Sequence, residues 1–208
     1  RRRAMLLLLS LAHVPPGWAL FALGAFYARY ARGAGLDGGD FNYAAYAAGT
    51  EPWAAMAACG DLARFVRDHA ASVALLEKLD HPAFADAVRL LLGWARALQG
   101  RTASPLSLAS ADFDEDAWLR RHAEPGFFAA IHAEVKLQLA VLLGTPGDAE
   151  AAARRAEALI AHLPGTLWQA QHECWHALAL ARAATPDAVA VLQHAHAALA
   201  ARALHCAD

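Results

Sequence analysis

Residues 167–183, LWQAQHECWHALALARA, decide the fold class of this chain. Apolar residues recur in this stretch at the three- and four-residue spacing that places side chains on one face of an α-helix. One stripe comprises Leu167, Ala170, Cys174, Ala177, Leu178 and Ala181. A second stripe comprises Trp168, His172, Trp175 and Ala179. Because a helix covered on two sides normally packs between other helices, the stretch predicts a buried helix in an all-α protein.

The same stretch contains the zinc-protease pattern His-Glu-x-x-His, formed by His172, Glu173 and His176. One helix face would present both imidazoles to Zn²⁺, and the glutamate would polarise a bound water. The next helix would supply His194 or His196 as a third ligand. With 11 histidines in 208 residues the pattern arises readily by chance, so we favour packing roles for these histidines over a metal site.

The composition predicts helices almost throughout. Alanine and leucine dominate, β-branched residues are sparse, and charged residues make up only 18% of the chain. The formal net charge is −2 and the arginines are scattered, so the basic surface needed for nucleic acid is not expected. Cys59, Cys174 and Cys206 are too widely spaced to suggest a disulfide framework or a thiolate zinc site, which favours a reducing cytoplasm.

The N-terminus resembles a signal peptide in part, because three arginines at residues 1–3 precede an apolar run at residues 5–11. Pro15-Pro16-Gly17 ends this run far short of the roughly 20 residues of a membrane span, and the next apolar run, 18–28, is also short. We therefore expect two packed helices joined by a Pro-Gly turn, with a signal or anchor sequence as the alternative. Because the first residue is arginine, we expect the chain to belong to a longer multidomain protein.

Turn signals divide the chain into about ten segments of helical length. They lie at residues 15–17, 33–40, 60–61, 81–82, 100–110, 124–126, 144–148, 164–165 and 185–186. Helix starts are expected at Asp61, at Asp148 and at Thr185-Pro186-Asp187. Helices of similar length joined by short turns pack antiparallel. Residues 1–208 are therefore expected to form a single helical-repeat region, a degenerate tetratricopeptide-like α-solenoid.

The longest expected loop, residues 100–112, leads into the acidic run 112–116, Asp-Phe-Asp-Glu-Asp. Carboxylates in a first helical turn are stabilised by the helix dipole, and we favour that role over a divalent-metal site. Tryptophans and exposed acids are also candidate contacts for a partner protein. The candidate contact residues are Trp53, Trp94, Trp118, Asp112 and Asp114.

Several short segments follow one another in the order of a known family. They are Gly33 with the aromatic residues Phe41, Tyr43 and Tyr46, then Gly60-Asp61, His81-Pro82, and residues 98–102, 113–115, 136–138, 163–166 and 175–178. In this order the chain resembles the tetratricopeptide-like helical region of large bacterial signalling proteins. These proteins couple a serine/threonine-kinase-like domain and an AAA/STAND-type ATPase to a GAF domain and a sensor histidine kinase. The family usually has a Phe-Tyr pair where this chain has Cys174-Trp175, which implies that the zinc-like pattern lies in an aromatic packing helix.

The catalytic motifs of such proteins are missing from these residues. There is no phosphate loop ending in Gly-Lys-Ser/Thr, no His-Arg-Asp kinase loop, no phospho-acceptor histidine motif and no serine elbow. We therefore expect no catalytic residue and no cofactor in this segment. The resemblance implies a scaffold that contacts flanking domains of the same polypeptide or another protein, and a zinc hydrolase using His172, Glu173 and His176 is the alternative.

Overall fold

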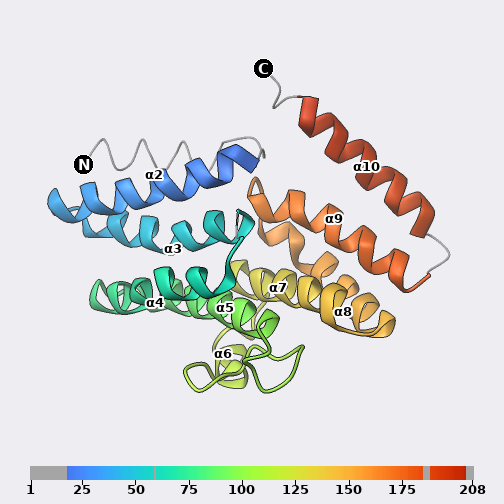
Figure 1. The fold of residues 1–208 in the computed structure, drawn as a ribbon, viewed down its shortest axis with the longest axis horizontal. Helices are drawn as coiled ribbons and strands as arrows, with labels where there is room; N and C mark the ends of the chain where they lie inside the picture. Colours follow the sequence, from blue (N-terminus) through green and yellow to red (C-terminus); the bar gives the residue numbers. More distant parts are fainter. Residues whose placement is uncertain (1–17, 59, 185–187, 205–208) are drawn as a thin grey trace. The chain divides into compact units, whose positions relative to one another are not determined.

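The computed structural model describes residues 18–58, 60–184 and 188–204 (Figure 1). Within these ranges the chain forms nine α-helices, one short 3₁₀-helix and no strand. The all-α prediction is confirmed. The expected helix before Pro15 lies outside the described residues. The chain divides into two compact units, residues 1–99 and 100–208.

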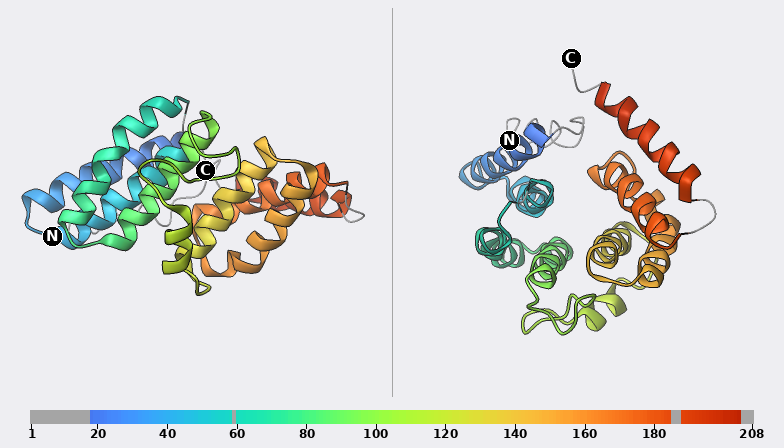
Figure 2. Two further views of the ribbon diagram at one scale, coloured as in Figure 1. Left: turned by 90° about the horizontal axis from the view of Figure 1, so that it is seen from below. Right: turned by 45° about the vertical axis from the view of Figure 1, so that its right-hand side comes forward.

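The first unit consists of two pairs of neighbouring helices. They are α2 (Trp18–Asp37), α3 (Phe41–Ala57), α4 (Leu62–Lys78) and α5 (Pro82–Leu98). Helix α2 packs against α3, helix α4 packs against α5, and α3 also contacts both α4 and α5. Because the connections at 38–40 and 79–81 are short, the helices of each pair run antiparallel, as can be followed in Figure 2.

Small residues allow α2 and α3 to approach closely. An added Cβ at Gly35 would lie only 2.9 Å from the backbone nitrogen of Ala44, so this position has no space for a side chain. The predicted turn at residues 33–40 is therefore wrong in its first half, because α2 continues to Asp37. The turn itself contains Gly39, whose φ of +68° is a left-handed conformation that glycine adopts without strain.

We expect Gly35→Ala to destabilise the first unit by about 1–3 kcal/mol, because its methyl group would press on the α3 backbone. The matched substitution Gly33→Ala lies in the same helix with nothing within 4 Å of the added Cβ. It should stabilise the unit by up to about 1 kcal/mol, because alanine favours a helix over glycine. Urea unfolding followed by circular dichroism measures both effects, and an equal gain in the two variants would contradict the close approach of α2 and α3.

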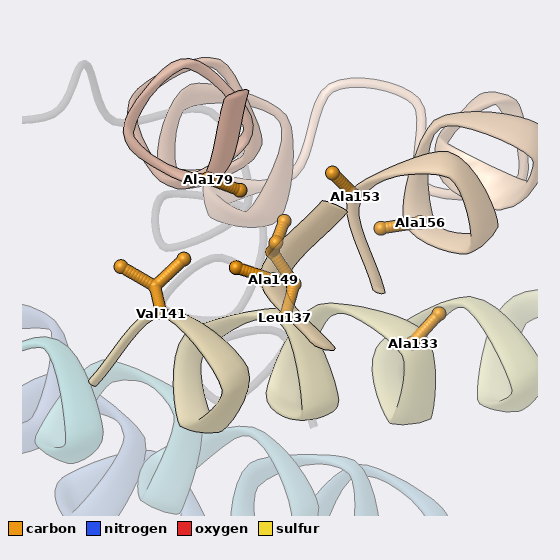
Figure 3. Close-up of a cluster of buried hydrophobic side chains, with 7 residues drawn as sticks. All are labelled: Ala133, Leu137, Val141, Ala149, Ala153, Ala156 and Ala179. Atoms are coloured by element: carbon orange, nitrogen blue, oxygen red, sulfur yellow. The ribbon is translucent and has the colours of Figure 1, made fainter. Parts of the chain in front are cut away.

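The second unit is built around helix α7. Its elements are α6 (Glu115–Arg121), α7 (Phe127–Leu143), α8 (Pro146–Leu159), the 3₁₀-helix η1 (Ile160–His162), α9 (Leu167–Arg182) and α10 (Ala188–Leu204). Helix α7 packs against α8 and α9, and α9 also packs against α8 and α10. Buried side chains from α7, α8 and α9 meet in a cluster that Figure 3 shows: Ala133, Leu137, Val141, Ala149, Ala153, Ala156 and Ala179. Most of them are alanines, which lets the three helices pack closely.

The helix starts predicted from the sequence agree only in part with those of the structure. Asp61 accepts a backbone hydrogen bond at 2.9 Å and begins α4, as predicted. Asp148 is not the N-cap of α8, because the helix begins earlier, at Pro146, with Thr145 as the cap. Proline suits the first helical position, whose N–H would have no helical partner, and Asp148 completes a capping box two residues later. The expected start at residues 185–187 lies outside the described residues.

The apolar run 18–28 is part of α2, which packs against α3. No helix in the described part of the chain is long and apolar enough to cross a membrane. The signal-like run at residues 5–11 lies outside that part.

Candidate functional site

Helix α7 carries polar side chains at four alternate positions, His132, Glu134, Lys136 and Gln138. His132, Glu134 and Gln138 are buried, although most of this helix is apolar. Residues four apart share a helix face, so His132 and Lys136 lie on one face while Glu134 and Gln138 lie on another. Buried polar groups cost free energy unless they are bonded, so the partners of α7 define the polar sites of this unit.

On the first face, the carboxylate of Glu115 from α6 accepts four hydrogen bonds. His132 Nε2 and Lys136 Nζ lie 3.0 and 2.9 Å from Oε1. The Leu108 N–H and the Ser107 hydroxyl donate to Oε2 at 2.8 and 3.2 Å. Lys136 also donates to a backbone oxygen of the loop that precedes α6. One carboxylate therefore connects α6, α7 and this loop.

The electrostatics fix the protonation of this cluster. Burial acts to raise the pKa of Glu115, but hydrogen bonds from His132, the Leu108 N–H and Lys136 outweigh it and lower the pKa to about 2. Burial lowers the pKa of His132, although Glu115 acts in the opposite direction. The neutral imidazole therefore carries its proton on Nε2, because an ionised carboxylate can only accept. The Nδ1 atom of His132 is left with a lone pair.

Trp118 holds the ring of His132 in place. The two rings are stacked, with centroids 5.3 Å apart and planes at 21°. The ring of Trp118 also contacts the ring of His122, and these two centroids are 4.4 Å apart. Its side chain is only 1% exposed. Trp118 therefore packs in the core and offers no surface to a partner in this conformation.

We expect Glu115→Gln to destabilise the second unit at neutral pH, because it removes the charge that Lys136 and His132 face. A pKa lowered from 4.5 to about 2 corresponds to about 3 kcal/mol. Since the folded state binds this proton less readily than the unfolded chain, the contribution is present above about pH 4.5 and is lost as the pH falls toward 2.

Urea unfolding of the wild type and Glu115→Gln at about pH 7 and about pH 3 measures this effect, and the gap between the two proteins should narrow at the lower pH. Asp116→Asn is the matched control, because Asp116 is an exposed acid in the same helical turn. A gap that stays constant with pH, or one reproduced by Asp116→Asn, would contradict the assigned role of Glu115.

On the other face of α7, Glu134 contacts helix α9. The Nδ1 atom of His172 lies 2.7 Å from Glu134 Oε1, and the two side chains are 10% and 1% exposed. His176 stacks on His172 with ring centroids 5.1 Å apart, and its Nε2 lies 3.7 Å from Glu157 Oε2. The first histidine of the zinc-like pattern therefore bonds to a buried carboxylate of a neighbouring helix.

The other residues of the predicted zinc site, the third ligand His194 or His196 and the water-polarising Glu173, do not gather around this pair. His194 and His196 are exposed on α10, and Glu173 is partly exposed on α9. Within the described residues, no group of three or more His, Cys, Asp or Glu side chains is placed to hold a metal ion. Burial and the neighbouring His172 lower the pKa of His176. The pattern therefore supplies two stacked imidazoles on a packed helix.

We expect His172→Ala to lower the free energy of unfolding by about 3 kcal/mol, because it leaves the buried Glu134 without its partner. His176→Ala should cost about 1 kcal/mol, because Glu157, which it faces, is exposed. Urea unfolding with and without added Zn²⁺ compares the two variants. If the two histidines bound zinc, added Zn²⁺ would stabilise the wild type, and each of the two substitutions would abolish this stabilisation.

The remaining contact candidates are placed in different surroundings. Trp94 is 7% exposed and its ring lies 6.0 Å from that of Phe65, so it packs in the core of the first unit. Trp53 is partly buried on α3. Asp112 and Asp114 are exposed.

The acidic run 112–116 divides its side chains between two roles. Asp114 is the N-cap of α6 and accepts a hydrogen bond from the Ala117 N–H at 2.8 Å, which agrees with the expected helix start. Glu115, in contrast, turns inward to His132 and Lys136. The sequence indicates that this run starts a helix but does not distinguish its inward acid from its exposed ones.

Helix α2 exposes an aromatic face, defined by Phe26, Tyr27 and Tyr30. These side chains are 62, 36 and 55% exposed. Phe26 and Tyr27 make an edge-on ring contact with centroids 5.8 Å apart, and Phe26 and Tyr30 share a helix face because they are four residues apart. The apolar run 18–28, which includes Phe26 and Tyr27, was predicted to be packed, so this exposed face was not expected from the sequence.

The described chain is therefore an all-helical protein of adjacent packed helices. It matches no protein-family model, no curated protein and no solved structure. The resemblance to bacterial signalling proteins stays a prediction.

Proposed function

We propose that this chain is a non-catalytic helical scaffold that mediates protein–protein or interdomain contacts. The observation that carries the proposal is the aromatic face of α2, where Phe26 and Tyr30 are each more than half exposed. Aromatic residues are enriched in protein interfaces, where they supply large contact areas with few rotatable bonds. Exposed rings gathered on one helix therefore favour a partner surface over a solvated one.

The packing of neighbouring helices supports a scaffold of the α-solenoid type. Helix α3 contacts both helices of the next pair, and α9 contacts α8 and α10, so neighbouring helix pairs within each unit pack on one another. In stacked helices of this kind, small rotations between pairs alter a binding surface and bias the state of what is bound there.

The signalling context of the proposal comes from the sequence resemblance. The resemblance implies two kinds of partner. One is a kinase-like, ATPase or histidine-kinase domain that flanks this segment in the same polypeptide, and the other is a separate protein of a bacterial cytoplasm. The exposed acids Asp112 and Asp114, with the partly exposed Trp53, are further candidate contacts.

A zinc hydrolase at His172, Glu173 and His176 is the weaker candidate. The bond from His172 to the buried Glu134 is the type of contact that a packing histidine makes, and it gives no separate reason to assign a hydrolytic reaction.

Site-specific photo-crosslinking in the native host tests the scaffold proposal. A photo-reactive phenylalanine at Tyr30 should capture one protein, or a flanking domain, that the same group placed at Arg67 does not capture. Arg67 is a suitable control because it is also exposed on a helix of the first unit.

The captured protein or domain should then bind the purified chain, and Tyr30→Ser should weaken this binding about tenfold or more, as expected of an aromatic residue that dominates an interface. Arg67→Ser should leave the affinity unchanged. Equal capture at the two positions, or an unchanged affinity of Tyr30→Ser, would contradict the proposal.

A further inference from the structure

The second unit contains a cavity of about 300 Å³ between α6, the α6–α7 turn, α7 and α8. Leu119, Ala129 and Leu159 form part of its apolar wall. The polar side chains that line it are His122, His132 and Arg155. The cavity therefore combines an apolar interior with nitrogen-bearing groups.

Arg155 makes the cavity electropositive. Its guanidinium has no hydrogen bond or ion pair with the residues that the structure describes, whereas the adjacent Arg154 pairs with Glu150. No aspartate or glutamate is among the lining residues. Glu115, which bonds His132, is already neutralised by Lys136. The guanidinium of Arg155 is therefore available to pair with an anionic ligand, and no carboxylate in the cavity lining competes for it.

We propose that this cavity binds a small monocarboxylate with an apolar body, whose carboxylate pairs with Arg155 and whose body lies against Leu119, Ala129 and Leu159. A planar guanidinium matches the two oxygens of a carboxylate and can bond both. A volume of about 300 Å³ lies at the lower end of the range of small-molecule sites, so the cavity suits a small ligand. This site goes beyond the proposed scaffold function and does not depend on it.

His132 gives the site a second property. Its ring lines the cavity, its side chain is 4% exposed, and its Nδ1 has no hydrogen-bond partner in the described part of the chain. The charged groups that act on it are Glu115 from α6, Lys136 from α7 and Arg155 from α8. A bound carboxylate adds negative charge and favours the imidazolium form. Binding is therefore accompanied by proton uptake at His132 and strengthens as the pH falls toward the pKa of this imidazole.

Benzoate is a suitable probe, and benzamide is its neutral control of nearly the same shape. Titration of the full chain followed by ¹⁵N-resolved NMR should give a Kd of about a millimolar for benzoate, with shifts centred on the amides of Ala129 and Leu159. Benzamide should bind at least about tenfold more weakly, because it cannot form the charged pair.

Arg155→Gln should weaken benzoate binding about tenfold or more, and Arg154→Gln should leave it unchanged. Ala129→Phe, which fills the cavity, should abolish binding while circular dichroism verifies that the protein is folded. If Arg155→Gln failed to fold, Ala129→Phe and the benzamide control would still show whether the cavity binds a carboxylate. Equal binding of benzoate and benzamide, equal effects of the two arginine substitutions, or no shifts near Ala129 would overturn the proposal.

Discussion

The second unit depends on the pairing of the polar groups that α7 buries. Glu115 reaches α7 from the preceding short helix, and Glu134 on α7 itself reaches His172 of α9. Removal of one partner from such a buried pair leaves a polar group that neither water nor protein satisfies, so each pair constrains the elements at both of its ends. The polar groups of α7 therefore help to determine the position of α6 and of the loop before it. They also help to determine the contact of α9 with α7.

The features that local chemistry determines were predictable. Asp61 caps α4 because a carboxylate that follows glycine satisfies free N–H groups, whichever tertiary structure surrounds it. Glycines were predicted less well, because a glycine can end a helix or allow a second helix to approach. Gly33 and Gly35 look identical in sequence, and only the presence of Ala44 against Gly35 distinguishes their roles. Such information lies in the neighbouring helix and not in the local sequence.

The polar sites were predicted least well. The pattern from His172 to His176 drew attention to zinc, whereas the carboxylate that bonds His172 lies 38 residues away in sequence. A signal was nevertheless available: alternate polar residues in the apolar helix 127–143 required partners once the helix was taken as buried. The sequence pattern shows that such partners are needed, but it does not choose Glu115 and His172 among the many polar residues of the chain.

The alanine-rich contact of α7, α8 and α9 has a thermodynamic consequence. An alanine side chain loses no rotamer freedom when it is buried, so the side chains of Ala149, Ala153 and Ala156 add no entropic cost to that of ordering the backbone. Each also removes little apolar area from water, and the heat-capacity change of unfolding scales with that area. A core of this kind has a shallow stability curve, so its free energy of unfolding varies less between cold and warm conditions than that of a core rich in leucine and phenylalanine.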